Sequence, residues 1–263
     1  MSDTAEVTDP ARADAIGRRY MIRFEEDTLK QRPLATRVII EFLGTALLVT
    51  VAAGAGVINR YAGGNTISRT AAVVAPGALV MALIYAWGPL SGLHINPGVT
   101  LAFTGRRVFR ASWALPYIVA QLAGAVLAAL FLQLMFSHVA AGGNYPINKS
   151  GGDWRSLVME IVLTTILVSV ILNTATGYRS IGHNAAIAVG ATIALLGLFA
   201  SPISGASMNP ARSFGPAVAS GVYEAQLLYW AAPITGALIA SLLYEFLFMR
   251  RGREPVDHGE LKP

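Results

Sequence analysis

Six long runs of apolar residues make up most of the chain, and short stretches richer in charge, glycine or proline separate them. A bilayer core about 30 Å thick needs about 20 apolar residues in a helix to cross it. All six runs are close to that length, and we expect each to be a transmembrane helix. They cover residues 38–59, 71–90, 113–136, 155–175, 183–201 and 225–248.

Two further apolar segments, HINPGVTLAF at 94–103 and SMNPARSFGPAVA at 207–219, are long enough for only half a crossing. Each contains an Asn-Pro pair, which favours a helix start because asparagine can cap free backbone N–H groups and proline needs no N–H there. Irregular backbone at membrane depth is tolerated where it is buried in protein or lines a watery cavity. We therefore predict two re-entrant half-helices that begin at Asn96 and Asn209.

The two halves of the chain repeat one another, with Asn209 following Asn96 after 113 residues. At this offset Gly77, Ala78, Leu83, Pro89, Ser91, Gly92, Asn96 and Pro97 fall on Gly190, Ala191, Leu196, Pro202, Ser204, Gly205, Asn209 and Pro210. Each half holds three spans and one half-span, and because three is odd the second half enters the membrane with inverted topology. The half-helices should then come from opposite faces and meet near the midplane.

The composition agrees with a membrane location, since 54% of the 263 residues are hydrophobic and 13% are charged, about half the charged fraction of a soluble domain. Residues 1–36 and 249–263 are polar terminal segments, and 1–36 lacks the apolar core of a signal peptide. One membrane domain remains at 37–248, with inverted repeats at about 37–137 and 154–248.

The net charge of +5 could indicate nucleic acid, but the basic residues lie mostly at the chain ends and in a few junctions. An even number of spans puts both termini on one side, and the positive-inside rule makes that side the cytoplasm. We therefore expect an integral membrane protein that binds no nucleic acid. The cytoplasmic loops would hold Arg106, Arg107, Arg110 and Arg179, and the outer loops Arg60, Arg69, Lys149 and Arg155.

Glu41, Glu160 and Arg212 stand inside apolar segments, where a charge suggests function by default, and Glu245 also falls within the sixth predicted span. An inverted-repeat secondary transporter also uses broken helices, but no paired acids suggest proton or sodium coupling. No nucleophile–base pair, phosphate loop or metal cluster is visible, and cysteine is absent, so we expect no enzyme, no cofactor and no metal. A purely structural membrane protein would not need twin polar breaks.

Together these features resemble the major intrinsic protein family, which comprises the aquaporins and aquaglyceroporins. The resemblance covers about residues 37–248 and includes the Ser-Gly pair four residues before each box asparagine and the acids of the first and fourth spans. The first box has glycine where the family usually has alanine, and glycine loosens a helix slightly. The two boxes are Asn96, Pro97 and Gly98, and Asn209, Pro210 and Ala211, with Arg212 after the second.

The resemblance implies an all-α, aquaporin-like fold and a passive channel for water and small neutral solutes that excludes ions. It also implies a homotetramer in the cell membrane and a bracing role for Glu41 and Glu160 at carbonyls that line the pore. Both half-helix N-termini carry partial positive charge, which repels cations. The amides of Asn96 and Asn209 can donate to a passing oxygen.

The family's spacing also implies a selectivity filter, in which small residues predict a wide opening. A wide filter is similar to those of the branches that pass glycerol, urea or uncharged metalloid acids. Other family markers favour a strictly water-selective channel, and the filter receives more weight because pore width acts directly on the solute. The filter residues are Pro76, Gly197, Ala206 and Arg212, and the water-channel markers are Ser213, Tyr229 and Trp230.

Overall fold

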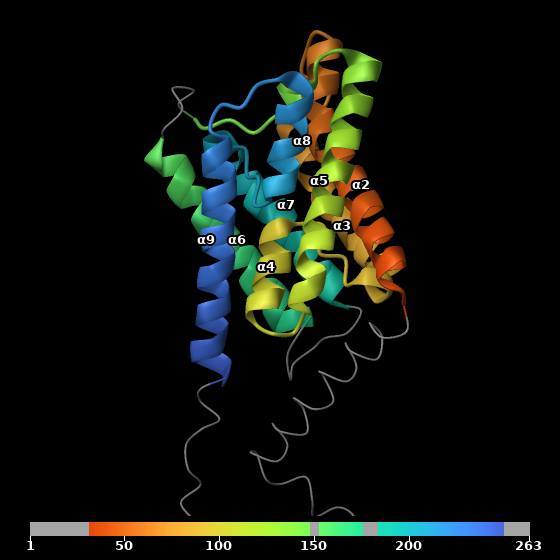
Figure 1. The fold of residues 1–263 in the computed structure, drawn as a ribbon. Helices are drawn as coiled ribbons and strands as arrows, with labels where there is room; N and C mark the ends of the chain where they lie inside the picture. Colours follow the sequence, from red (N-terminus) through yellow and green to blue (C-terminus); the bar gives the residue numbers. More distant parts are fainter. Residues whose placement is uncertain (1–31, 148–152, 176–183, 250–263) are drawn as a thin grey trace, which may run out of the picture.

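A computed structural model describes residues 32–147, 153–175 and 184–249, and within these ranges every regular element is helical. Six of the described helices are long and apolar enough to cross a membrane, which confirms the six predicted spans (Figure 1). They are α2 (Leu34–Tyr61), α3 (Arg69–Ser91), α5 (Ala111–Phe136), α6 (Trp154–Ala175), α7 (Ala185–Ser204) and α9 (Gln226–Tyr244), with α9 continuing into a π-helical turn, η3 (Glu245–Met249).

Two short helices, α4 (Pro97–Gly105) and α8 (Pro210–Ser220), lie between the long ones. In Figure 1, α4 lies in the lower half of the bundle and α8 in the upper half, so the two half-helices come from opposite ends. The start of α2 and the end of α9 both lie at the lower end. A 3₁₀ turn, η1 (Val139–Gly142), belongs to the loop between α5 and α6.

The first span begins earlier than hydropathy predicts, at Leu34 and not at residue 38. The sequence prediction begins the span after Arg37, because a charged residue interrupts an apolar run. In the structure Arg37 is fully buried in the helix, and its guanidinium lies 4.7 Å from the centre of the Trp113 ring. A cation over an aromatic face is stabilised there, so the helix continues through the charge. Most of the predicted terminal segments, residues 1–31 and 250–263, falls outside the described residues.

Glycines set the closest approaches between the long helices. A Cβ on Gly77 would lie 2.4 Å from the carbonyl oxygen of Gly190, and one on Gly190 would lie 2.6 Å from that of Gly77, so α3 and α7 cross backbone to backbone. Gly124 brings α5 against α2, and Gly236 brings α9 against α6, in the same manner. Small residues permit this packing where no hydrophobic effect drives helices together.

Candidate functional site

Each Asn-Pro box starts a half-helix with the predicted capping chemistry. Asn96 Oδ1 accepts the backbone N–H of Gly98 at 2.9 Å, and Asn209 Oδ1 accepts that of Ala211 at 3.0 Å. Both asparagines have extended backbone, as N-cap residues do, and proline takes the next position. The free N–H groups of both helices therefore point toward the middle of the bundle.

The two boxes are also bonded to each other. The Nδ2 of Asn96 donates to the carbonyl of Met208 at 2.8 Å, and the Nδ2 of Asn209 donates to the carbonyl of Ile95 at 2.8 Å. Each amide nitrogen carries two N–H groups, so one per asparagine remains for a molecule beside it. The arrangement joins the two half-helices and still leaves two donors at their meeting point.

The segments that precede the boxes, 92–96 and 205–209, share an unusual backbone. A left-handed conformation costs about 1–2 kcal/mol at each residue other than glycine, so the surrounding contacts must hold it. Positive φ occurs at Gly92, Leu93 and Ile95 (85°, 46° and 41°) and at their repeat partners Gly205, Ala206 and Met208 (78°, 48° and 53°).

Glu41 supplies those contacts for the first segment, and its side chain is fully buried. Its Oε1 accepts the backbone N–H of His94 at 2.9 Å and the hydroxyl of Ser91 at 2.8 Å. Its Oε2 accepts the backbone N–H of Ile95 at 2.7 Å and the amide of Gln121 at 2.8 Å. Because these N–H groups turn toward the carboxyl group, the peptide carbonyls face away from it.

Glu160 repeats this arrangement in the second segment and is also fully buried. Its Oε1 accepts the hydroxyl of Ser204 at 2.6 Å and the N–H of Ser207 at 2.8 Å, while Oε2 accepts the N–H of Met208 at 2.7 Å. Neither acid lines the cavity described next. The geometry therefore places both acids behind the irregular backbone, on its far side from the cavity.

A cavity of about 250 Å³ runs past both boxes. All residues of 92–96 and 205–209 line it, and its walls extend from Ala72 in α3 to Ala185 in α7. The described lining residues include two ionisable side chains, His94 and Arg212, and no carboxylate. Such a cavity has mainly apolar walls and a few polar groups, a lining that suits small neutral molecules.

The four filter positions expected from the family's spacing lie on this cavity. The guanidinium of Arg212 is fixed on two sides: Nη1 donates to the carbonyl of Gly142 and Nη2 to the carbonyl of Ala52, both at 2.8 Å. Its acceptors belong to the loop between α5 and α6 and to α2, which spacing along the sequence could not reveal. Arg212 is therefore a fixed charge at the wall of the cavity.

Val73 of α3 is a filter neighbour that the sequence did not indicate. A Cβ built on Gly197 would lie 2.9 Å from the Cβ of Val73, and both residues line the cavity. The room expected from the missing side chain at Gly197 is thus partly filled by Val73. At Ala206, which lies on the re-entrant backbone, the cavity is bounded by a methyl group alone.

The three markers that favour a water channel contact neighbouring protein groups, and one of these groups, the Ser207 hydroxyl at 2.6 Å from that of Ser213, belongs to a residue that lines the cavity. Ser213 is 1% exposed and donates to Asn144 Oδ1 at 2.9 Å, and the Tyr229 hydroxyl donates to the carbonyl of Ser204 at 2.7 Å. Trp230 packs edge-on against an aromatic ring of α8. None of the three lines the cavity, so all three act on packing and not directly on solute width.

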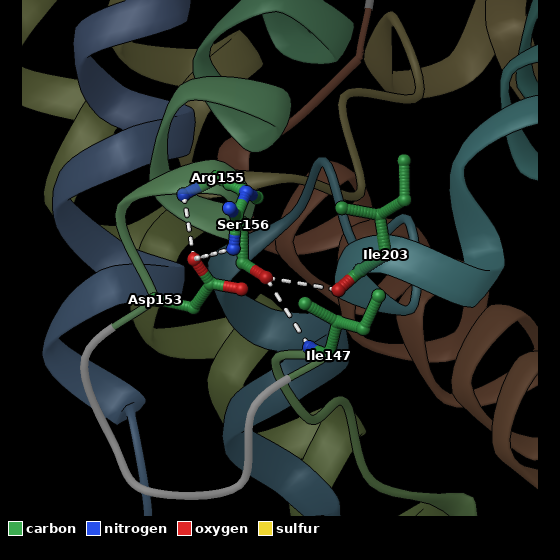
Figure 2. A network of polar contacts seen from close by, with 5 residues as sticks. All are labelled: Ile147, Asp153, Arg155, Ser156 and Ile203. Carbon is green, nitrogen blue, oxygen red and sulfur yellow. Dashed lines mark hydrogen bonds and ion pairs between the residues drawn. The ribbon is translucent and has the colours of Figure 1, made fainter.

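The loop between α5 and α6 is attached to the end of α7 through Ile147 (Figure 2). The N–H of Ile147 and the hydroxyl of Ser156 both donate to the carbonyl of Ile203, at 2.7 and 2.8 Å. Asp153 starts α6 by accepting the N–H of Arg155 at 3.0 Å. The described part of the loop that ends at Ile147 is therefore attached next to the second re-entrant segment.

Comparison with known proteins agrees with this geometry. A family model described as Major intrinsic protein matches residues 28–244. Aquaporin NIP1-1 of Oryza sativa subsp. japonica is 43% identical over 217 residues, which covers 82% of this chain and 75% of that protein. Probable aquaporin NIP4-2 of Arabidopsis thaliana is 41% identical over 216 residues, with 81% and 75% covered.

A solved structure shows the same fold. The X-ray structure of the aquaglyceroporin from Plasmodium falciparum superposes with a TM-score of 0.74 at 22% identity, covering 84% of this chain and 99% of that chain. The expected arrangement of six spans and two half-helices is therefore confirmed as a fold.

Proposed function

The chain belongs to the major intrinsic protein family, and we propose that it is a passive channel, not an enzyme, for water and small uncharged solutes. The observation that carries the proposal is the cavity that passes both half-helix N-termini and all four filter positions. A passive pore needs a continuous path with polar groups that replace part of a solute's hydration.

The mechanism uses the meeting point of α4 and α8. Their N-terminal ends carry partial positive charge, which disfavours cations and protons there. The remaining N–H of Asn96 and of Asn209 donates to the oxygen of a solute in the cavity, which interrupts the chain of waters that a proton would need. Glu41 and Glu160 hold the backbone of the two segments from behind.

Arg212 supports the exclusion of cations at the outer part of the path, because its guanidinium is fixed on the cavity wall. Replacing it by alanine should raise cation or proton leak while the flux of neutral solutes persists. Unchanged ion exclusion in Arg212→Ala would count against this role.

Solutes wider than water are included in the proposal, with glycerol, urea and neutral metalloid acids as the candidate class. Support comes from Ala206, whose side chain is a single methyl group on the cavity wall, and from Gly197. Pro76 also lines the cavity, and it is a compact ring where water-selective relatives are expected to carry a larger aromatic group.

A strictly water-selective channel is the second candidate function. Ser213, Tyr229 and Trp230 favour it as markers of lineage. The wide-filter alternative receives more weight because these three residues do not line the cavity, whereas Ala206 and Gly197 do. A secondary transporter receives less weight still, because the described cavity wall offers no carboxylate for ion coupling.

The assembly and orientation follow from the family and from charge. We place both termini in the cytoplasm, since the described ends lie on one side of the bundle (Figure 1) and the basic loops favour that side. A homotetramer in the cell membrane, with one pore in each subunit, completes the proposal.

Reconstitution into liposomes tests it. Stopped-flow light scattering under gradients of an impermeant osmolyte, glycerol, urea and a neutral metalloid acid should show fast flux of water and of at least one larger solute. Flux of water alone would favour the strict water channel. Flux no faster than in empty liposomes would overturn the channel proposal.

A further inference from the structure

We propose that Asn144, in the loop between α5 and α6, is a positioning residue for the selectivity filter that sets the place of Arg212 without touching the solute. The inference rests on the proposed channel function, because a filter has meaning only if solutes pass. Asn144 does not line the cavity, and no pattern in the sequence singled it out.

The side-chain amide of Asn144 forms hydrogen bonds beside two filter residues, Ala206 and Arg212. It is 3% exposed, its Nδ2 donates to the carbonyl of Gly205 at 3.0 Å, and its Oδ1 accepts the hydroxyl of Ser213 at 2.9 Å. Gly205 directly precedes Ala206, and Ser213 directly follows Arg212. The side chain therefore ties the backbone before one filter residue to the helix turn after another.

The same loop carries one of the two acceptors of the Arg212 guanidinium. Gly142, two residues before Asn144, accepts Nη1 of Arg212 at 2.8 Å. A Cβ on Gly142 would lie 2.6 Å from the carbonyl oxygen of Ala53, so this backbone has no room to move toward α2. Asn144 therefore fixes where the loop meets α8, and Gly142 passes that position on to the guanidinium.

The contact is too tight to be incidental. A Cβ on Gly205 would lie 2.7 Å from Nδ2 of Asn144, so the re-entrant backbone and the amide fit against each other with no space for a methyl group. Gly205 also has a φ of 78°, a value that glycine adopts without strain. The repeat partner Gly92 has a similar φ of 85°, so the missing side chain of Gly205, and not its φ, is the feature that permits the approach of Asn144.

Among the described residues, which begin at residue 32, the first half of the repeat shows no loop residue in this role. Thr100, the repeat partner of Ser213, contacts His94 Nδ1 at 3.2 Å and accepts the amide of Gln121 at 3.0 Å. Gln121 belongs to the long helix α5. The loop between α5 and α6 thus braces only the second re-entrant segment, which is the one that contributes Ala206 and Arg212 to the filter.

Asn144 is not needed merely to attach the loop. Ile147 and Ser156 already bond to Ile203 at the end of α7 (Figure 2). Removing the Asn144 amide should therefore leave the loop attached and the protein folded, while the guanidinium of Arg212 loses its fixed position. A selectivity readout separates this role from a structural one.

The test compares wild-type protein with Asn144→Ala in proteoliposomes. We expect the ratio of larger-solute flux to water flux to change by about tenfold, the scale of one hydrogen bond, and cation leak to rise. Asn59→Ala is the matched control, because Asn59 also donates to and accepts from one loop residue, Ile67, at 2.8 and 2.7 Å. Asn59 does not line the cavity, and its removal should leave the flux ratio unchanged.

Combination with Arg212→Ala shows whether Asn144 acts through the arginine. If it does, Asn144→Ala adds no further change in flux ratio or leak to Arg212→Ala. Ser213→Ala removes one of the two bonds of Asn144 and also the contact of the Ser213 hydroxyl with that of Ser207 at 2.6 Å. It should shift the ratio in the same direction, and it supplies the test if Asn144→Ala does not fold, with Ser207→Ala as the control for the lost Ser207 contact.

The possible failures are distinct. If wild-type protein conducts, and folded Asn144→Ala or Ser213→Ala has the same flux ratio and the same cation leak, then the role of Asn144 is overturned and the proposed function is not. Additive effects of Asn144→Ala and Arg212→Ala overturn the action through Arg212. A wild type that conducts nothing overturns the proposed function, and the role of Asn144 with it.

Discussion

Asn96 and Asn209 are linked reciprocally, since each donates an amide N–H to the carbonyl that precedes the other asparagine, over 2.8 Å in both directions. Each also caps its own half-helix. A shift of either helix would therefore break a bond on both sides of the meeting point. The pore centre is one unit built from two distant parts of the chain.

Glu160→Gln should destabilise the protein by about 1–3 kcal/mol and reduce water flux. Three donors converge on the Glu160 carboxyl group, and a glutamine offers one acceptor oxygen and turns an N–H group toward a backbone donor. Thermal unfolding of the purified protein measures the first effect and liposome shrinkage the second. The control is Glu224→Gln on the exposed surface, and equal behaviour of the two variants would contradict the bracing role.

Gly197→Ala should destabilise the protein by about 1–3 kcal/mol, the usual cost of overpacking. The added Cβ would meet the Cβ of Val73 at 2.9 Å and push α3 away from α7. Unfolding midpoints in denaturant measure the change.

Val73→Gly in the same chain should relieve much of that cost, because it removes the Cβ and Cγ1 atoms that the new Cβ of Gly197→Ala would meet at 2.9 and 3.5 Å. The two substitutions are then non-additive, as expected of residues in contact. Additive effects in the double variant would show that the side chain at 197 points elsewhere, and the filter geometry would need revision.

Ala206→Asn should reduce the flux of glycerol, urea or a metalloid acid several-fold more than the flux of water. Asparagine tolerates the positive φ of 48° at this position better than a β-branched residue does, and its amide narrows the path while offering hydrogen bonds to water. The water flux of the same vesicles is the internal control. Equal loss of both fluxes in folded protein would mean that this position constricts the pore without selecting by size.

Gly98→Ala should stabilise the first half-helix by about 0.5–1 kcal/mol and leave water flux intact. The new Cβ would lie 3.2 Å from Asn96 Oδ1, and Ala211 already carries a Cβ at the corresponding position of the second box. Differential scanning calorimetry is the measurement. A lower unfolding temperature together with lost flux would show that the first box cannot adopt the geometry of the second.

Much of the architecture could be predicted because its causes are local. Span length follows from apolar runs, and the half-helix starts follow from the capping chemistry of Asn96 and Asn209. The repeat between the two halves then indicates that the half-helices meet. Each of these inferences needs only neighbouring residues or a fixed offset.

The remaining features depend on contacts between residues far apart in the sequence. Asn144 has partners 61 and 69 residues away, so no local pattern marks it. The contact between Val73 and Gly197 depends on how closely α3 and α7 cross. The early start of α2 depends on the contact between the Arg37 guanidinium and the ring of Trp113. Packing decides all three.

The temperature and concentration dependence of flux through reconstituted wild-type protein tests the central claim most directly. A pore through the two Asn-Pro boxes should give water flux with a much shallower temperature dependence than that of empty liposomes, and solute flux that rises linearly with concentration. A steep temperature dependence equal to that of bare lipid, or solute flux that saturates as in a carrier, would contradict the assignment of an open passive channel.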